Sequence, residues 1–103
     1  MEMVLVYITT KDKSEAQRIG RALVQERFAA CVNILDGMES IYWWEGKVES
    51  SQEAILIAKT KNTLVEKLMA KVKELHSYSV PCVLALPISQ GNPGYLSWLR
   101  ENC

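Results

Sequence analysis

Two kinds of hydrophobic pattern divide this chain into strands and helices. Three stretches are apolar at consecutive positions, as is typical of strands buried on both faces. These are Met3–Thr10 and residues 54–58 and 82–86. Between them, apolar side chains recur at helical spacing and predict a first helix over residues 14–27 and a second over residues 63–75.

Capping signals support these helices and predict a third. Asp12 followed by Glu15 matches a capping box, and Thr63 with Glu66 has the same spacing. Asn92 and Pro93, an N-cap residue and a first-turn proline, predict a short helix near the end of the chain. Pro87 should end the strand over residues 82–86 or place it at a sheet edge.

A long β-hairpin over residues 29–60 is the most distinctive prediction. Both halves are rich in β-branched and aromatic residues, and they meet at Glu45 and Gly46, where glycine suits a tight turn. At ~3.3 Å per residue, arms of about a dozen residues would reach ~40 Å and project beyond a domain of this size. The aromatic run Tyr42, Trp43 and Trp44 on this arm predicts contact with a second copy of the chain.

The element order β-α-β-β-α-β with a short C-terminal helix predicts an α+β, ferredoxin-like fold. Residues 1–103 should form a single domain, because no linker or repeat interrupts the chain. In this fold, helices cover one sheet face only. Since the predicted strands are apolar on both faces, the sequence predicts self-association through the sheet.

Charge and cysteine content narrow the function classes. Twelve basic and twelve acidic residues leave no net charge, which argues against nucleic acid as a partner. The chain has neither a signal-like N-terminus nor an apolar run near ~20 residues, so we expect a cytoplasmic protein without a membrane partner. Its three widely spaced cysteines are expected to be reduced.

Several motifs, taken together and in order, resemble the CutA family of divalent-ion tolerance proteins. They are residues 29–33 (AACVN), 40–47 (SIYWWEGK), 59–60 (KT), 75–81 (LHSYSVP) and 91–99 (GNPGYLSWL). The resemblance spans nearly the whole chain. It implies a ferredoxin-like protomer packed as a homotrimer and a cytoplasmic role linked to copper and other divalent cations.

His76, the only histidine, is the first candidate metal ligand. Imidazole is a borderline ligand suited to Cu(II) or Zn(II), although a histidine at a helix C-terminus can instead bond the last free carbonyls. The resemblance favours the metal role, because His76 matches the family's His-Pro-Tyr motif with Ser77 at the proline. The first-strand cysteine implicated in copper-binding relatives corresponds here to Ile8.

Cys31 and Glu53 are the other candidate ligands. Cys31 could pack as a small hydrophobe or, as a thiolate, join His76 if the fold or a neighbouring subunit brings them together. Glu53 and Lys59 lie six residues apart on one strand face and could line a polar cleft at a subunit boundary or form an interchain ion pair. With these ligands, we expect Cu(II) or another divalent cation to bind weakly.

Three function classes remain open at this point. A metal-responsive, non-enzymatic protein is favoured by the resemblance and by His76. The alternative is a signalling trimer that binds a small molecule or a protein, similar in architecture to the nitrogen-regulatory PII proteins. An enzyme ranks third, because Cys31 and His76 would be its only plausible nucleophile and base, with no residue to orient the histidine.

Overall fold

The computed structural model describes residues 2–103 and has four strands, three α-helices and one 3₁₀ turn. In chain order these are β1 (Met3–Thr10), α1 (Lys13–Gln25), β2 (Cys31–Trp44), β3 (Lys47–Lys61), the turn η1 (Asn62–Leu64), α2 (Val65–Leu75), β4 (Val83–Pro87) and α3 (Pro93–Glu101). The four strands form one antiparallel sheet in the order β2-β3-β1-β4. The predicted ferredoxin-like α+β fold with an added C-terminal helix is therefore confirmed.

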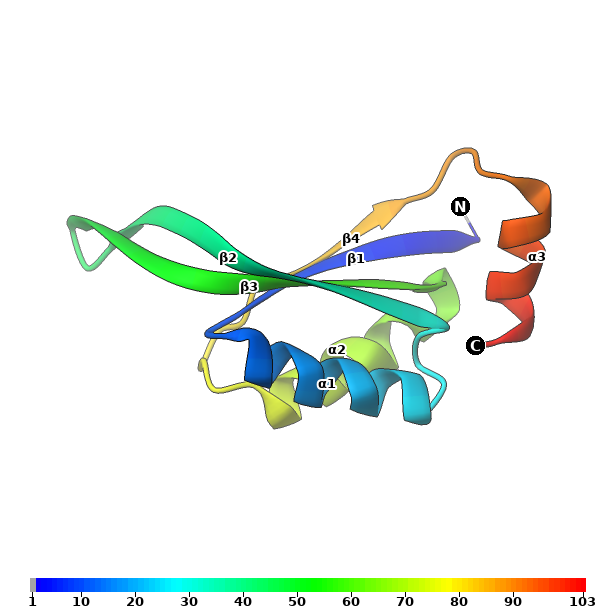
Figure 1. Ribbon diagram of the computed structural model, residues 1–103, viewed down its shortest axis with the longest axis horizontal. Helices are drawn as coiled ribbons and strands as arrows, with labels where there is room; N and C mark the ends of the chain where they lie inside the picture. Colours follow the sequence, from blue (N-terminus) through cyan, green and yellow to red (C-terminus); the bar gives the residue numbers. More distant parts are fainter. Residues whose placement is uncertain (1) are drawn as a thin grey trace.

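Helices α1 and α2 lie side by side on one face of the sheet, and α3 packs at one end of it (Figure 1). The core lies between this face and the two helices. Val6 and Ile8 of β1 and Leu56 of β3 are fully buried there, together with Ile19 and Leu23 of α1. Each such side chain contributes roughly 1.5–3 kcal/mol by leaving water, so the sheet and helices are held together mainly by aliphatic packing.

The hairpin is confirmed with its predicted tip. Its arms are 14 and 15 residues long, and the turn residues Glu45 and Gly46 have φ angles of 50° and 77°, the left-handed pair that a type I′ turn requires. Near the middle of β2, the register shifts between Leu35 and Met38, with Gly37 at φ 75°. Beyond this bulge the hairpin projects past the rest of the sheet (Figure 1) and gives the molecule its 45 Å long axis.

Two of the predicted helix starts are confirmed. The Asp12 side chain accepts a hydrogen bond from the Glu15 N–H at 2.8 Å, and Asn92 accepts one from Gly94 at 3.0 Å, with Pro93 in the first turn of α3. Each side chain satisfies a backbone donor that has no partner within its helix.

The capping box at Thr63 was wrong, and the boundary of the fourth strand moves by one residue. The chain passes from β3 into α2 through the 3₁₀ turn η1, where the Val65 N–H bonds to the Asn62 carbonyl, and no side chain caps the helix. The tighter turn thus satisfies a donor that a capping side chain would otherwise satisfy. Strand β4 begins at Val83, one residue later than predicted, and Pro87 lies in this edge strand as expected.

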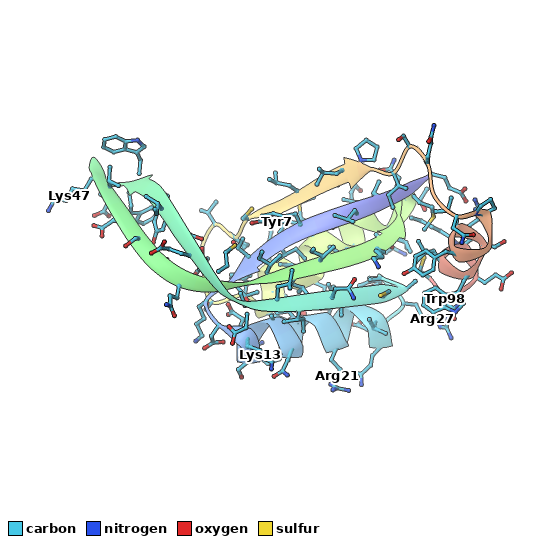
Figure 2. All side chains as sticks on the ribbon, turned by 45° about the horizontal axis from the view of Figure 1, so that its top comes forward. Tyr7, Lys13, Arg21, Arg27, Lys47 and Trp98 are labelled. Atoms are coloured by element: carbon cyan, nitrogen blue, oxygen red, sulfur yellow. The ribbon has the colours of Figure 1, made fainter. Side chains whose placement is uncertain are left out.

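The sheet face opposite α1 and α2 is apolar and open in the described chain. Ladder partners share a face, so the register places Leu5, Tyr7, Leu35, Ile55, Ile57, Leu84 and Leu86 there. Leu35, Leu84 and Leu86 are 55%, 58% and 49% exposed. Figure 2 turns this face, with Tyr7 on it, toward the viewer. No helix within residues 2–103 is long and apolar enough to cross a membrane.

Candidate functional site

A cleft of about 500 Å³ lies where the hairpin leaves the body of the sheet. The hairpin and the connection between α2 and β4 supply most of its lining, which includes Tyr42, Trp44, Ser51, Glu53, Tyr78 and Cys82. Thr9, near the end of β1, contributes to the floor. The cleft therefore combines aromatic walls with hydroxyl groups, a thiol and a carboxylate.

The carboxylate of Glu53 is the most polar group in the cleft and is held by a tyrosine. The residue is only 9% exposed, and its Oε2 accepts a hydrogen bond from the Tyr78 hydroxyl at 2.8 Å. Burial and the hydrogen bond to Glu53 both raise the pKa of Tyr78 above its usual value. The phenol therefore stays a hydrogen-bond donor, and it fixes the orientation of the Glu53 carboxylate.

The hairpin supplies the aromatic wall through residues two apart on β2. Tyr42 and Trp44 both line the cleft, and the Tyr42 hydroxyl lies 3.3 Å from the Ser51 hydroxyl on β3. Trp43, between them, points to the other face and is 74% exposed. The two neighbouring tryptophans thus have different environments, as the alternation of side chains along a strand predicts.

His76 is buried beside the cleft and uses both ring nitrogens in hydrogen bonds. Its side chain is 0% exposed, with Nδ1 3.0 Å from the backbone nitrogen of Tyr78 and Nε2 2.8 Å from the Thr9 carbonyl oxygen. A backbone N–H can only donate and a carbonyl can only accept, so Nδ1 is the acceptor and Nε2 carries the proton. A metal ion could therefore bind either nitrogen only by displacing one of these bonds.

Glu15, in the first turn of α1, is buried just behind His76. Its side chain is 1% exposed, and its two oxygens accept hydrogen bonds from the backbone N–H groups of Lys11 at 3.0 Å and Ser77 at 2.8 Å. Burial alone would raise the pKa of this carboxyl, but these hydrogen bonds and the neighbouring His76 outweigh it and lower the pKa. Glu15 therefore ties the start of α1 to the connection that carries Tyr78.

Cys31 and His76 are far apart within one chain. Cys31 is paired with Lys59, whereas His76 is bonded to Thr9, which pairs with Ile55. The four residues from Ile55 to Lys59 alone correspond to about 13 Å along the strand. The nucleophile–base pair considered from the sequence is therefore not assembled in a single subunit.

Glu53 and Lys59 are also separated, although they share a strand face. The Lys59 ammonium group donates a hydrogen bond to the Tyr95 hydroxyl at 3.1 Å, beside α3, and this bond is the main reason that the pKa of Lys59 is raised. Among residues 2–103, no three His, Cys, Asp or Glu side chains form a group able to hold a metal ion. A site that joins His76, Cys31 and Glu53 thus stays a prediction that needs a second subunit.

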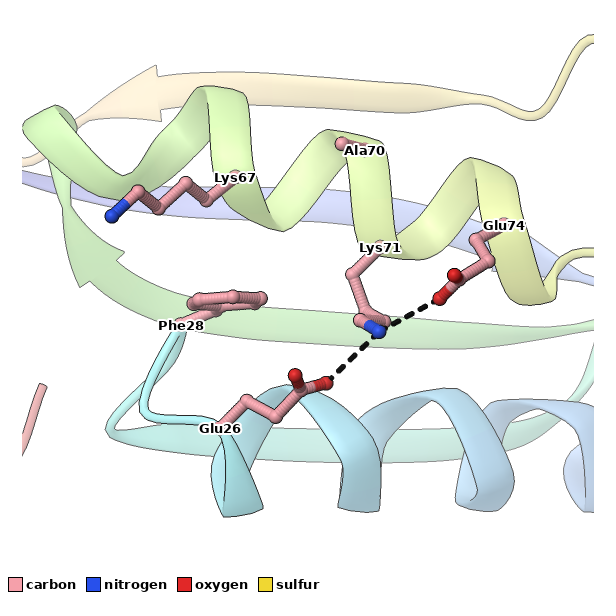
Figure 3. A pocket seen from close by; sticks show the side chains of 6 residues that line it. All are labelled: Glu26, Phe28, Lys67, Ala70, Lys71 and Glu74. Atoms are coloured by element: carbon pink, nitrogen blue, oxygen red, sulfur yellow. Dashed lines mark hydrogen bonds and ion pairs between the residues drawn. The ribbon is translucent and has the colours of Figure 1, made fainter.

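A second cavity, of about 320 Å³, lies between α2 and the end of α1 (Figure 3). The Lys71 ammonium group lies 3.2 Å from Glu26 and 2.7 Å from Glu74, and both carboxylates line the cavity. The hydrogen bond to Glu74, followed by that to Glu26, raises the pKa of Lys71. This cluster of one lysine and two glutamates joins the two helices, and we assign it no ligand.

Comparison with known proteins identifies the family. The family model for the CutA1 divalent ion tolerance protein matches residues 4–102. The chain belongs to the CutA1 family. The resemblance seen in the sequence motifs is thereby confirmed, and the family name favours the divalent-cation class over the PII-like alternative.

Relatives and solved CutA1 structures agree with this assignment. A divalent-cation tolerance protein from Thermus thermophilus is 51% identical over 98 residues, which cover 95% of each chain. A chloroplastic CutA from rice is 46% identical over 96% of this chain, which spans only 56% of the rice protein. The Thermus structure matches with a TM-score of 0.95 at 50% identity over 97% of both chains. The rice structure matches with a TM-score of 0.96 at 45% identity. The match covers 99% of this chain and 94% of the rice chain.

Ser77 stands at the position where the resemblance places a proline. Proline has no N–H, whereas the Ser77 N–H donates to the buried Glu15 carboxylate. This hydrogen bond fixes the turn at Ser77. Ile8, at the position of the first-strand cysteine, is fully buried in the core.

Sequence reasoning missed three residues of this region. The sequence patterns point to no role for Tyr78, treat Cys82 only as one of three reduced cysteines, and place Glu15 in a capping box. The one available signal was that Tyr78 and Cys82 flank a proline in a connection between secondary-structure elements, where functional side chains often lie.

Proposed function

We propose that this CutA1 protein takes part in divalent-cation tolerance as a binding protein, and that a metal ion such as Cu(II) binds weakly in the cleft through Glu53. The observation that carries the proposal is a nearly buried carboxylate, oriented by Tyr78, in a cleft of about 500 Å³ in a protein of this family. Carboxylate oxygens are ligands for many divalent ions, which agrees with tolerance of several metals.

Cys82 is the second protein ligand that the cleft can offer. It lines the same cleft as Glu53 and is not disulfide-bonded. Thiolate favours Cu(I) and zinc, and Cu(II) stands highest among the divalent first-row ions at a given site. One carboxylate and one thiol leave most coordination positions to water, so weak and reversible binding follows.

His76 and Cys31 remain further candidates within this proposal. His76 would become a ligand only if metal binding displaced its bond with the Tyr78 N–H or the Thr9 carbonyl. Cys31, on a distant part of the sheet, would require a neighbouring subunit. The proposal therefore ranks Glu53 first among the three.

A homotrimer is part of the proposal. The open sheet face and the projecting hairpin expose large hydrophobic side chains, including Ile41, Trp43 and Leu84 at 69%, 74% and 58%. Covering them with other copies of the chain would remove this apolar surface from water. We also propose that the protein acts in the cytoplasm, as expected from its sequence.

Calorimetric titration of the purified protein with Cu(II) tests the site. We expect Glu53→Gln to weaken binding by tenfold or more, Cys82→Ser to weaken it less, and Glu39→Gln to leave it unchanged. Glu39 is a matched control, because it is an exposed glutamate on the same hairpin whose ladder position faces the other way. Parental affinity in Glu53→Gln would overturn the assignment.

A further inference from the structure

We infer that the same cleft binds an organic ammonium group attached to an apolar body, with Glu53 as its counter-ion. This inference goes beyond the metal proposal and does not rest on it, because an amine needs no second metal ligand. It rests on the charge of the cleft, the geometry of the carboxylate and the aromatic side chains around it.

The charge of the cleft selects for a cation. Among the described residues that line it, Glu53 is the only carboxylate, and none is a lysine, arginine or histidine. Lys59 shares the strand face of Glu53 but lies six residues farther along β3. There its ammonium group donates a hydrogen bond to the Tyr95 hydroxyl. A carboxylate that is only 9% exposed has lost most of its hydration, and a cationic ligand would replace that lost interaction.

The hydrogen-bond pattern leaves one carboxylate oxygen for the ligand. Within residues 2–103, Glu53 accepts one side-chain hydrogen bond, from Tyr78 to Oε2. Oε1 is then the acceptor left for a donor that enters the cleft. An ammonium group carries three donors, so it can bond to Oε1 and still offer two donors to water or to hydroxyl groups of the cleft.

The aromatic walls suit the rest of such a ligand. Tyr42 and Trp44 line the cleft from one face of β2, and Tyr78 lines it from the connection before β4. Aromatic faces attract an ammonium group through their negative quadrupole and also cover its apolar body. The volume of about 500 Å³ falls within the range of roughly 300–1,000 Å³ that holds small organic ligands.

These features fit an organic ammonium better than a bare divalent ion. A divalent ion requires several anionic or strongly polar ligands, and the described chain brings no three His, Cys, Asp or Glu side chains together. A single charge on an amine is matched by the single charge of Glu53. We therefore expect the amine to bind more tightly than the metal ion, and the two to compete.

Titration with 2-phenylethylamine in the presence of EDTA tests the inference without free divalent ions. Its neutral and anionic analogues, 2-phenylethanol and 3-phenylpropanoate, have a similar apolar body and serve as matched ligands. By calorimetry, we expect the amine to bind at least tenfold more tightly than the alcohol and the carboxylate not to bind. Equal affinity for amine and alcohol, or no amine binding at millimolar concentration, would overturn the inference.

Variants then assign the binding to the cleft. Glu53→Gln keeps an acceptor for Tyr78 but removes the charge, so it should weaken amine binding at least tenfold, while the control Glu39→Gln should not change it. Trp44→Leu removes an aromatic wall but keeps the charge of Glu53, and it should also reduce amine affinity. This variant tests the cleft if Glu53→Gln does not fold. Retained amine affinity in a folded Glu53→Gln or in Trp44→Leu would contradict the proposed cleft. Because EDTA removes free metal ions from these titrations, a lack of amine binding would not affect the conclusion drawn from the separate Cu(II) titration.

Discussion

Replacing Glu15 with alanine should destabilise this protein far more than loss of an ordinary surface glutamate. The carboxylate is 1% exposed and holds the Lys11 and Ser77 N–H groups, which lie 66 residues apart in the chain. Alanine would leave both donors without this acceptor and would open a small cavity between α1 and the connection after α2. The variant therefore probes a long-range contact within the fold.

The structure sets the size of the effect. A buried donor that loses its partner costs about 1–3 kcal/mol, so two such donors give a loss of about 2–6 kcal/mol in the free energy of unfolding. Removing a negative charge from the first turn of a helix adds roughly 0.3–1 kcal/mol. Since water can enter beside the shortened side chain, we expect a total near the lower part of this range, about 3 kcal/mol.

Urea denaturation followed by circular dichroism measures this loss at one fixed protein concentration, because subunit association would couple to unfolding. Glu66→Ala is the matched control. Glu66 is also an acidic residue in the first turn of a helix, α2, but it is exposed. If Glu15→Ala lost no more stability than Glu66→Ala, the assigned hydrogen bonds would contribute nothing and the reasoning would be refuted.

The pH dependence of stability provides a second check on Glu15. Its pKa is lowered in the folded protein, so the folded state favours the ionised form. The stabilisation is complete above the ordinary carboxyl pKa of about 4.5 and is lost as the pH falls through the lower folded-state value. The difference in stability between the parent and Glu15→Ala should therefore be constant near neutral pH and should shrink below about pH 4.5. An unchanged difference at pH 3 would contradict the ionised carboxylate as its cause.

The remaining predictions concern assembly and the hairpin tip. Light scattering of the purified protein at micromolar concentration should give the mass of a trimer, and a monomer mass would contradict association through the open face. Changing Ile41 and Trp43, which face away from the cleft and are 69% and 74% exposed in the single chain, together to serine should lower the melting temperature and loosen the assembly, since burial of each side chain would contribute a few kcal/mol; an unchanged melt would show that this side of the arm is not covered. Gly46→Ala should cost about 1–2 kcal/mol of stability by urea denaturation, because its φ of 77° strains any residue with a Cβ; an unaltered midpoint would show that the turn relaxes freely.

The sequence contained enough information to predict the fold because its local signals agree with one another. Met3–Thr10 is apolar on both faces because β1 lies inside the sheet, and Glu45 with Gly46 marks the hairpin turn. The capping box predicted at Thr63 was wrong because a pattern of two residues is weak evidence. The chain instead uses a 3₁₀ turn to satisfy a backbone donor at the start of α2. Local signals therefore fix the elements better than their boundaries.

The cleft was harder to predict because its contacts join distant parts of the chain. Glu53 could be chosen from the sequence because it shares a strand face with Lys59 and could line a polar cleft. Its partner Tyr78 lies 25 residues away in the next connection, and no spacing rule relates the two. Cys31 and His76 show the converse, because both are plausible metal ligands by residue type, yet the strand register keeps them apart.

The position of His76 affects how any experiment on the metal site should be interpreted. Its Nδ1 accepts the Tyr78 N–H, and its ring packs against the Tyr78 ring with centroids 4.8 Å apart, so it positions the phenol that orients Glu53. His76→Ala could therefore weaken copper binding without any direct bond between His76 and the metal. Tyr78→Phe separates the two roles, because it leaves the imidazole in place and removes only the hydrogen bond to Glu53. If Tyr78→Phe weakens binding as much as His76→Ala, the histidine acts by positioning the tyrosine; if only His76→Ala weakens it, the imidazole is itself a ligand.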